Sequence, residues 1–344
     1  MKLIRILLFP VAIIYDLITR IRNLFFDLGI FSSTSFKTPI IAVGNLSVGG
    51  TGKTPQIEYL IRLFLENHKV AVLSRGYGRS TKGFVQVKST SNSAEVGDEP
   101  LQFYKKFEQI TVAVDEKRVH GVQELLAQTE PANLILLDDA FQHRAIKAGY
   151  YLLLTKYDEL FVHDFLLPTG RLRESAIGAK RADAIVVSKC PSDLDLKEQE
   201  QIINALRRNF KGPIFFSSIS YADQVQNNLG DRIPLSNLKD YEIVLVTGIA
   251  KPSPLLDFLQ EKGIHFQHLK FKDHHEFSNE DIKQIVNQFS NLKSDQKIIL
   301  TTEKDFVRLE DQLDTLYYLE IQTKLLDKES DFNKLFFDYL TKKL

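Results

Sequence analysis

The chain has 344 residues, of which 44% are hydrophobic and 26% charged, as in an ordinary globular protein with room for two domains. Lys and Arg together number 44, as do Asp and Glu, so the excess of positive charge typical of nucleic-acid-binding proteins is absent. The single cysteine, Cys190, excludes an internal disulfide and a cysteine-rich metal site, and it fits a reducing cytoplasmic setting.

The N-terminal segment, residues 1–30, is rich in Ile, Leu and Phe with basic side chains interspersed. Its longest uncharged apolar run, residues 6–15, is about half the length of ~20 residues that spans a bilayer. No small-residue cleavage site of the secretory type follows the run. Two interpretations stay open: an amphipathic helix in the membrane interface, or a helix packed on the core. We favour the membrane surface, because Phe25, Phe26 and the scattered arginines exceed what a core helix needs.

A glycine-rich loop follows at residues 47–55, with the sequence Ser-Val-Gly-Gly-Thr-Gly-Lys-Thr-Pro. It stands between a strand-like run at 39–43 and apolar residues spaced for one helix face at 57–65. Backbone N–H groups of such a loop bind phosphate, the lysine reaches the β- and γ-phosphates, and the threonine hydroxyl holds Mg²⁺. The predicted nucleotide-binding residues are Ser47, Val48, Gly49, Gly50, Thr51, Gly52, Lys53 and Thr54, and Thr54 is also a predicted metal ligand. A flexible connector is the alternative, and the Gly-Lys-Thr sequence at a strand–helix junction argues against it.

Short apolar runs continue along the chain and alternate with helical stretches, which predicts a parallel sheet wrapped by helices. These runs lie at residues 70–74, 110–114, 134–137, 184–187 and 213–216. Residues 83–87 are typical of one arm of a hairpin.

The chain becomes polar and irregular near residues 220–240, and we place a domain boundary there. Beyond it, further strand-like runs at 242–246, 264–266, 297–300 and 316–321 indicate a smaller α/β unit. The predicted organisation is an amphipathic helix at 1–30, a phosphate-loop domain at 31–225 and a C-terminal α/β domain at 226–344.

Two adjacent carboxylates, Asp138 and Asp139, end the apolar run at 134–137. In phosphate-loop NTPases a carboxylate at such a strand end holds Mg²⁺, directly or through water. An ordinary polar strand end is the alternative, but adjacent carboxylates repel each other and a cation offsets that repulsion. Which of the two binds the metal directly stays open, because neighbours on an extended chain face opposite ways.

Three further segments carry candidate chemistry. Asp98, in Gly-Asp-Glu-Pro, is either a helix cap or the carboxylate that accepts a proton from an acceptor hydroxyl. Residues 273–275, Asp-His-His, could bring an Asp–His pair to the nucleotide from the second domain. Arg173 could neutralise phosphate charge and Glu174 could join the metal ligands, or the two form an exposed ion pair of little energetic weight.

The segment at residues 187–191, Val-Ser-Lys-Cys-Pro, ends the next strand, where GTPases carry a guanine-reading motif. Pro191 occupies the position of the aspartate that accepts hydrogen bonds from guanine, so ATP is the expected nucleotide.

With these motifs in order, the chain resembles the tetraacyldisaccharide 4′-kinases, the lipid A 4′-kinases of Gram-negative bacteria. The segments that carry the resemblance are 44–55, 74–79, 97–100, 137–144, 170–174, 273–274 and 302–305. The family's phosphate loop lacks the usual first glycine, so Ser47 fits it. Ala140 is a departure, because the family has glycine there, and this difference bears on the local turn.

The resemblance implies an α/β fold of the P-loop NTPase type, with ATP and Mg²⁺ as cofactors. It implies phosphorylation of the 4′-hydroxyl of tetraacyldisaccharide 1-phosphate to give lipid IVA, at the cytoplasmic face of the inner membrane. Neither a nucleic acid nor an obligate protein partner is expected. By motif, Asp98 is the base and His274 its partner, and the phosphate, metal and transition-state groups are Lys53, Thr54, Asp138, Asp139, Arg173 and Glu174. Secondary candidates are Tyr77, Arg118, Gln142 and His143.

Two alternatives stay open. A membrane-bound nucleotide switch would close its domains without transferring phosphate to a substrate, and a soluble small-molecule kinase would carry its N-terminal helix only as structure. Pro191 argues against a guanine switch, and the basic, apolar N-terminus argues against the soluble kinase.

Overall fold

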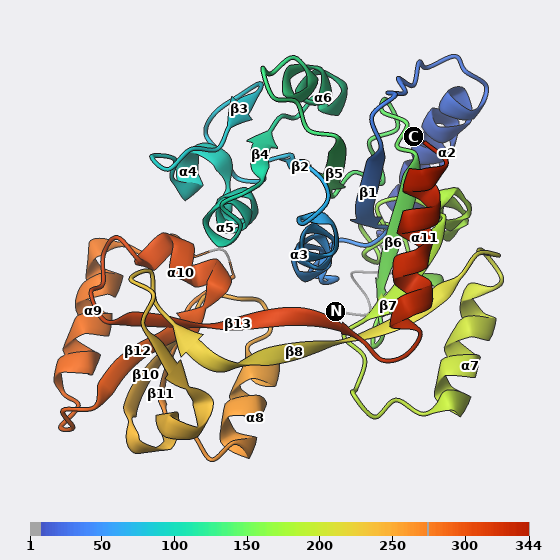
Figure 1. Cartoon of the computed structure of the whole chain (residues 1–344). Helices are drawn as coiled ribbons and strands as arrows, with labels where there is room; N and C mark the ends of the chain where they lie inside the picture. The colour runs from blue at the N-terminus through green and yellow to red at the C-terminus, as the bar shows by residue number, and fades with distance from the viewer. Residues whose placement is uncertain (1–7, 274, 344) are drawn as a thin grey trace.

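The computed structural model describes residues 8–273 and 275–343 of the chain. Its centre is one thirteen-stranded sheet in the order β11-β10-β12-β13-β8-β7-β6-β1-β5-β2-β4-β3, with β9 paired to β8 (Figure 1). The strands are β1 (Ile40–Asn45), β2 (Val70–Ser74), β3 (Val85–Gln86), β4 (Thr111–Val114), β5 (Leu134–Asp138), β6 (Tyr150–Lys156), β7 (Ala184–Ser188), β8 (Ile214–Gln226), β9 (Arg232–Pro234), β10 (Glu242–Thr247), β11 (Gln267–Lys270), β12 (Lys297–Thr302) and β13 (Leu316–Leu325).

Helices connect most of these strands. The α-helices are α2 (Phe9–Asp27), α3 (Lys53–Phe64), α4 (Ser93–Val96), α5 (Asp98–Lys106), α6 (Arg118–Leu126), α7 (Leu196–Leu206), α8 (Ser253–Glu261), α9 (Asn279–Ser290), α10 (Glu303–Leu309) and α11 (Glu329–Thr341). Short 3₁₀ helices are η1 (Phe161–His163), η2 (Ala176–Arg181) and η3 (Leu235–Asp240).

The larger half of the sheet confirms the expected parallel arrangement. Strands β4, β2, β5, β1, β6, β7 and the first part of β8 pair in parallel. Their residues are buried on both faces, as the nearly continuous apolar runs require. Helices α3, α5 and α11 cover one face, and α6 and α7 cover the other. The carboxyl ends of β1 and β5 therefore meet at one edge, where the phosphate loop and the Asp138–Asp139 pair are located.

Several strands differ from the expectation. β6 has no counterpart among the predicted runs, although Leu152 to Leu154 are apolar and buried between β1 and β7. β8 continues through residue 226, into the segment expected to be irregular, because its second part pairs with β13. In the smaller half, the strand expected at 264–266 starts later, at Gln267 of β11.

The antiparallel β8–β13 pair joins the two halves of the sheet and runs between them (Figure 1). After β13 the chain returns to the larger half, so α11 does not stay with the smaller unit in which the range 226–344 places it. Phe332 of α11 contacts Phe215 at a ring-centroid distance of 5.0 Å, and Phe336 contacts Tyr150 at 5.0 Å. Hydrophobic burial against the larger half explains this return.

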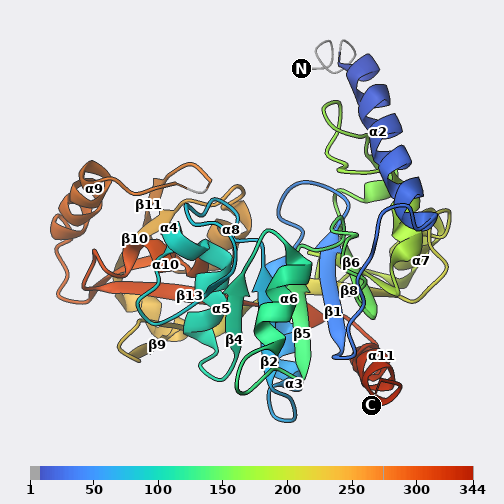
Figure 2. The ribbon, with the colours of Figure 1, turned by 90° about the horizontal axis from the view of Figure 1, so that it is seen from above.

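Helix α2 projects at one end of the molecule (Figure 2). Its large apolar side chains are exposed by about half, and they are Phe9, Val11, Ile13, Ile14, Leu17, Ile18, Ile21 and Leu24. Its other face contacts loops of the larger half, through side chains that include Tyr15 and Asn23. None of the helices in the described part of the chain is long and apolar enough to cross a membrane.

Candidate active site

The glycine-rich loop leads from β1 to the first residue of α3, Lys53. Gly49 and Gly52 have backbone φ angles of 109° and 80°, which residues other than glycine rarely adopt. Gly52 is the N-cap of α3 and supplies no side-chain oxygen, so the first N–H groups of the helix keep their capacity for an anion. The loop at residues 47–54 thus relies on glycine conformations and leads into a helix start that has no side-chain cap.

Side chains outside the loop hold its backbone in place. Asn45 Nδ2 donates to Thr51 Oγ1 at 2.8 Å, and Ser188 Oγ donates to the Thr51 carbonyl at 2.7 Å. The Val48 N–H donates to the Arg171 carbonyl at 2.8 Å. Because the loop is fixed by these contacts, its remaining N–H groups could bind an anion with little further ordering cost.

Asp138 ends β5 and is buried, with 1% of its surface exposed. Its Oδ2 accepts a hydrogen bond from Ser74 Oγ at 2.8 Å, whereas Oδ1 has no partner among the described residues. Burial raises the pKa of Asp138 to about 7, and the charges of Glu99 and Asp139 add to this increase. A buried carboxylate oxygen without a donor is costly, and a cation is one way to satisfy it.

Asp139 follows in the left-handed region, with φ 46°. Arg173 donates two hydrogen bonds to its carboxylate, at 2.8 and 3.0 Å, and Lys53 Nζ lies 3.8 Å from Oδ2. Burial alone would raise the pKa of Asp139, but Lys53 and Arg173 outweigh it and lower the pKa. Ala140, the next residue, does not have a positive φ angle, so this turn does not require glycine there.

Arg118 and His143 lie around the same strand end. Arg118 is 2% exposed and donates from Nη2 to the Asp138 carbonyl at 3.0 Å. Burial lowers the pKa of Arg118 to about 10, which leaves it charged at neutral pH. Burial and the charges of Arg118, Arg75 and Arg22 lower the pKa of His143 to about 4, so its ring is neutral.

Glu174 lies in a different environment from the one expected of a metal ligand. Its Oε1 accepts from Gln142 Nε2 at 3.0 Å and from Arg181 at 2.8 Å, and its Oε2 accepts from Asn23 at 2.8 Å. Both carboxylate oxygens are thus engaged by protein donors, and the residue is 1% exposed. Glu174 therefore connects α2, the loop after β5 and η2. This structural role differs from the expected role as a metal ligand.

Asp98 is the first residue of α5 and not its cap, which is Gly97. Its carboxylate forms a two-pronged ion pair with Arg308 of α10, with 2.8 Å between Nε and Oδ1. Arg308 also donates to the His275 carbonyl at 2.9 Å. His274, the expected partner of Asp98, lies outside the described residues. Its neighbour His275 pairs with Asp281 at 2.9 Å.

Three polar groups near the loop were not found from the sequence. Glu99 adds negative charge at Asp138, and Asn45 bonds both the loop and the Arg173 guanidinium. Lys189 has a backbone φ angle of 58°, and its ammonium group lies close to Gly50 of the loop. The distance from Nζ to an ideal Cβ position built on Gly50 is 3.7 Å. The sequence signal for Lys189 was its position in Val-Ser-Lys-Cys-Pro. By contrast, Tyr77, a secondary candidate, is 80% exposed.

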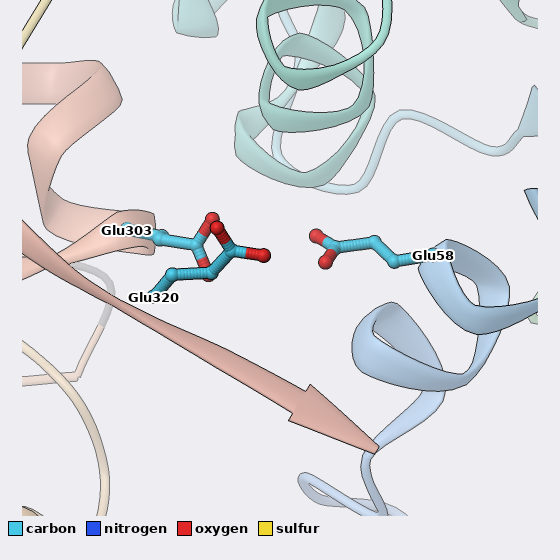
Figure 3. Close-up of side chains that lie close together, drawn as sticks. All are labelled: Glu58, Glu303 and Glu320. Carbon is cyan, nitrogen blue, oxygen red and sulfur yellow. The ribbon is translucent and has the colours of Figure 1, made fainter. Parts of the chain in front are cut away.

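A second group of carboxylates includes a residue of α3, the helix that follows the loop. Glu58 of α3, Glu303 of α10 and Glu320 of β13 have carboxylate oxygens within 4.8 Å of one another (Figure 3). Lys106, the last residue of α5, reaches all three, at 2.6, 2.7 and 2.9 Å respectively. Burial raises the pKa of Glu303 to about 8, and the charge of Glu58 adds to the increase. The lysine occupies the position that a metal ion would take among these glutamates.

Comparison with known proteins places this chain in a family. Residues 4–341 match the family described as Tetraacyldisaccharide-1-P 4'-kinase. The chain is similar to the Tetraacyldisaccharide 4'-kinase of Flavobacterium johnsoniae, with 47% identity covering 100% of this chain and 99% of the relative. It is 44% identical to that of Bacteroides thetaiotaomicron, over 97% of this chain and 92% of the relative. A crystal structure of the "apo" form of LpxK from Aquifex aeolicus in complex with ATP superposes with a TM-score of 0.79 at 29% identity, covering 98% of this chain and 99% of that one.

Proposed function

The chain belongs to the tetraacyldisaccharide 4′-kinase family, and we propose that it transfers the γ-phosphoryl group of ATP to the 4′-hydroxyl of a tetraacyldisaccharide 1-phosphate, the step that forms lipid IVA in lipid A biosynthesis. The observation that carries the proposal is the convergence of Lys53 and Arg173 on Asp139 beside a phosphate loop. The ATP-bound structure at 29% identity supports ATP as the donor.

Positive charge and position are what phosphoryl transfer requires most from the protein. Lys53 lies at the start of α3, where the N–H groups of the loop and the helix dipole attract the phosphates. Arg173, held by the Asn45 carbonyl at 2.8 Å and by Asp139, adds a second positive group at the same edge. We propose that these two residues neutralise charge on the transferred phosphoryl group.

The residues at this edge fit Mg²⁺. Asp138 Oδ1 is a buried hard oxygen with no partner among the described residues, and Thr54 lies directly after Lys53 at the start of α3. We propose that Thr54 and Asp138 hold the ion, with Asp139 next to it. When bound there, Mg²⁺ would supply positive charge that offsets the negative charge of the phosphates.

For the acceptor, we propose Asp98 as the general base. Its carboxylate is oriented by the ion pair with Arg308, and it stands at the start of α5 beside Glu99, whose charge acts on Asp138. Arg308 comes from the smaller half of the molecule, so the base lies where the two halves meet.

For location, we propose that the exposed apolar face of α2 lies in a lipid surface at the cytoplasmic face of the inner membrane. The face combines about half-exposed Ile and Leu side chains with Arg20 and Arg22 nearby, the composition of an interfacial helix. An acyl-chain substrate resides in that surface, so the anchor and the acceptor would share one location.

The test is an assay of the full chain with ATP, Mg²⁺ and tetraacyldisaccharide 1-phosphate in detergent micelles. Mass spectrometry should detect a lipid product heavier by one phosphate, formed in step with ADP. Release of inorganic phosphate without that product would instead support a nucleotide switch.

A further inference from the structure

Helix α2 has a polar face that points into the protein, opposite its exposed apolar face. On this inner face, Tyr15, Thr19 and Asn23 follow one another at four-residue intervals, which places them on one side of a helix. Thr19 is 7% exposed, and its hydroxyl stays with the helix by donating to the Asp16 carbonyl. Tyr15 and Asn23 reach out of the helix to another segment.

That segment is the pair Arg173–Glu174, in the loop between η1 and η2. Tyr15 Oη donates to the Arg173 carbonyl at 2.9 Å, and Asn23 Nδ2 donates to Glu174 Oε2 at 2.8 Å. Arg144 fixes the same part of α2 from below, because its Nη1 donates to the Asn23 carbonyl at 2.8 Å. A helix that served only as a lipid anchor would have no need of these specific bonds.

Arg173 also contacts the residues around the proposed phosphate site. The Arg173 N–H donates to the Leu46 carbonyl, one residue before the phosphate loop, at 2.8 Å. The Arg173 guanidinium binds Asp139 and the Asn45 carbonyl, and Asp139 lies 3.8 Å from Lys53 Nζ. Arg173 thus connects α2 to the phosphate site. Its carbonyl accepts the hydrogen bond from Tyr15 of α2, and its guanidinium is the proposed phosphate-neutralising charge.

We infer that Tyr15 and Asn23 are positioning residues for phosphoryl transfer, which hold Arg173 against Asp139 and so couple the seating of α2 to the geometry of the phosphate site. The inference rests on the proposed function for its catalytic part. Displacement of a charged group by about 1 Å can cost about 100-fold in rate. Loss of the bond that fixes the Arg173 carbonyl, or of the bond that fixes the neighbouring Glu174 carboxylate, therefore has a measurable effect.

The test compares full-length Tyr15→Phe and Asn23→Ala variants with the wild type in the lipid-kinase assay. We expect kcat to fall about tenfold in each single variant, with the KM for ATP within about twofold, because the loop itself is unaltered. Binding to vesicles of phosphatidylethanolamine and phosphatidylglycerol should not change, since the apolar face of α2 is intact.

Tyr59→Phe is the matched control. It removes a tyrosine hydroxyl that bonds Glu329 and Asn333 between α3 and α11, far in the chain from Arg173, and its kcat should equal the wild-type value. An Arg173→Lys background supplies a second check. If Tyr15 acts through Arg173, Tyr15→Phe should lower kcat much less in that background than in the wild type.

Hydrogen exchange of the peptide that covers residues 170–175 gives a readout independent of catalysis. Loss of either bond should speed exchange of the Arg173 amide, and Tyr59→Phe should not. An unchanged exchange rate in both variants, or an unchanged kcat in an active preparation, would overturn the inference. If the wild type forms no phosphorylated lipid, the proposed function fails, and the exchange rates still decide whether α2 holds the Arg173 segment.

Discussion

Two groups of carboxylates contact helix α3, and they differ in what balances their charge. Asp138 and Asp139 lie at its first residue, Lys53, and Asp138 keeps one buried oxygen without a partner among the described residues. Glu58, Glu303 and Glu320 form the other group, farther along the helix (Figure 3). Lys106 contacts every one of them, and Arg62 binds Glu320 at 2.6 Å. A cluster of acidic side chains therefore indicates a metal only where the protein has not supplied its own cation.

The difference also separates two kinds of energetic role. Lys106 joins α3, α5, α10 and β13 in one buried network, so the glutamate group connects the two halves of the molecule. The aspartate group is left partly unsatisfied, which is a cost in stability that an active site accepts for binding. Substitutions in the glutamate group should therefore affect folding stability, and substitutions in the aspartate group should affect catalysis.

The largest expected effect is that of Asp138→Asn on phosphoryl transfer. The substitution keeps the shape but removes the anionic oxygen, and we expect kcat to fall about 1,000-fold, as for loss of a main electrostatic group. Stability should stay within about 1 kcal/mol of the wild type, because no buried charge remains to be satisfied. The kinase assay and urea unfolding measure the two.

Asp183→Asn is the control for this change. Asp183 precedes β7, accepts a hydrogen bond from the Tyr151 N–H and has a pKa raised by burial. It lies at the opposite end of β7 from Ser188, the residue of that strand that bonds the phosphate loop. Its variant should keep wild-type kcat. Activity of Asp138→Asn at the level of this control would remove Asp138 from the site.

The next effect is that of Lys106→Met on stability. Without the ammonium group, the three glutamates lose their shared partner, and breaking a buried ion network costs about 3–5 kcal/mol of unfolding free energy. The adjacent Lys105, which pairs with Glu310 at a more exposed position, gives the matched variant Lys105→Met, expected to lose at most about 1 kcal/mol. Equal losses in urea unfolding would show that the Lys106 network carries no special weight.

Metal binding sharpens the comparison more directly. With a non-hydrolysable ATP analogue present, electron paramagnetic resonance of free Mn²⁺ should report binding to the wild type and to Glu320→Gln alike. In Asp138→Asn the affinity should fall at least about tenfold. Reduced binding in Glu320→Gln with full binding in Asp138→Asn would reverse our assignment of the two groups.

The smallest expected effect is a change in pH dependence from Glu303→Gln. Since burial raises the pKa of Glu303 from 4.5 to about 8, the folded state holds a proton that the unfolded state has lost between these values. The unfolding free energy should therefore decrease as pH rises from about 5 to about 8, and the variant should show a flatter profile. An identical slope in both proteins would contradict the protonated state of Glu303.

The sequence was sufficient for features that depend on local pattern. The glycine-rich loop between a strand and a helix, the buried strands of the larger half and the family resemblance all follow from short segments with fixed spacing, and the comparisons confirm the family. β6 was missed although it is apolar, and β8 was cut short because its second part owes its strand conformation to pairing with β13 rather than to its own composition.

Features that depend on distant segments could not be predicted. Arg173 meets Asp139 across 34 residues, and Arg308 meets Asp98 across 210. The pattern around Glu174 gave no sign that Asn23 and Arg181 would engage its oxygens, so the residue was assigned to the metal. Helix α11 was placed with the smaller unit for the same reason, because nothing in its sequence specifies against which sheet its apolar face packs.

The position at which the lipid receives phosphate is the most direct test of the central claim. Wild-type protein, ATP and tetraacyldisaccharide 1-phosphate would be incubated, and the lipid product examined by phosphorus–proton correlation NMR. The account predicts a new phosphorus resonance coupled to the proton on the 4′ carbon. A new resonance coupled to any other sugar proton, or inorganic phosphate as the sole new species, would contradict it.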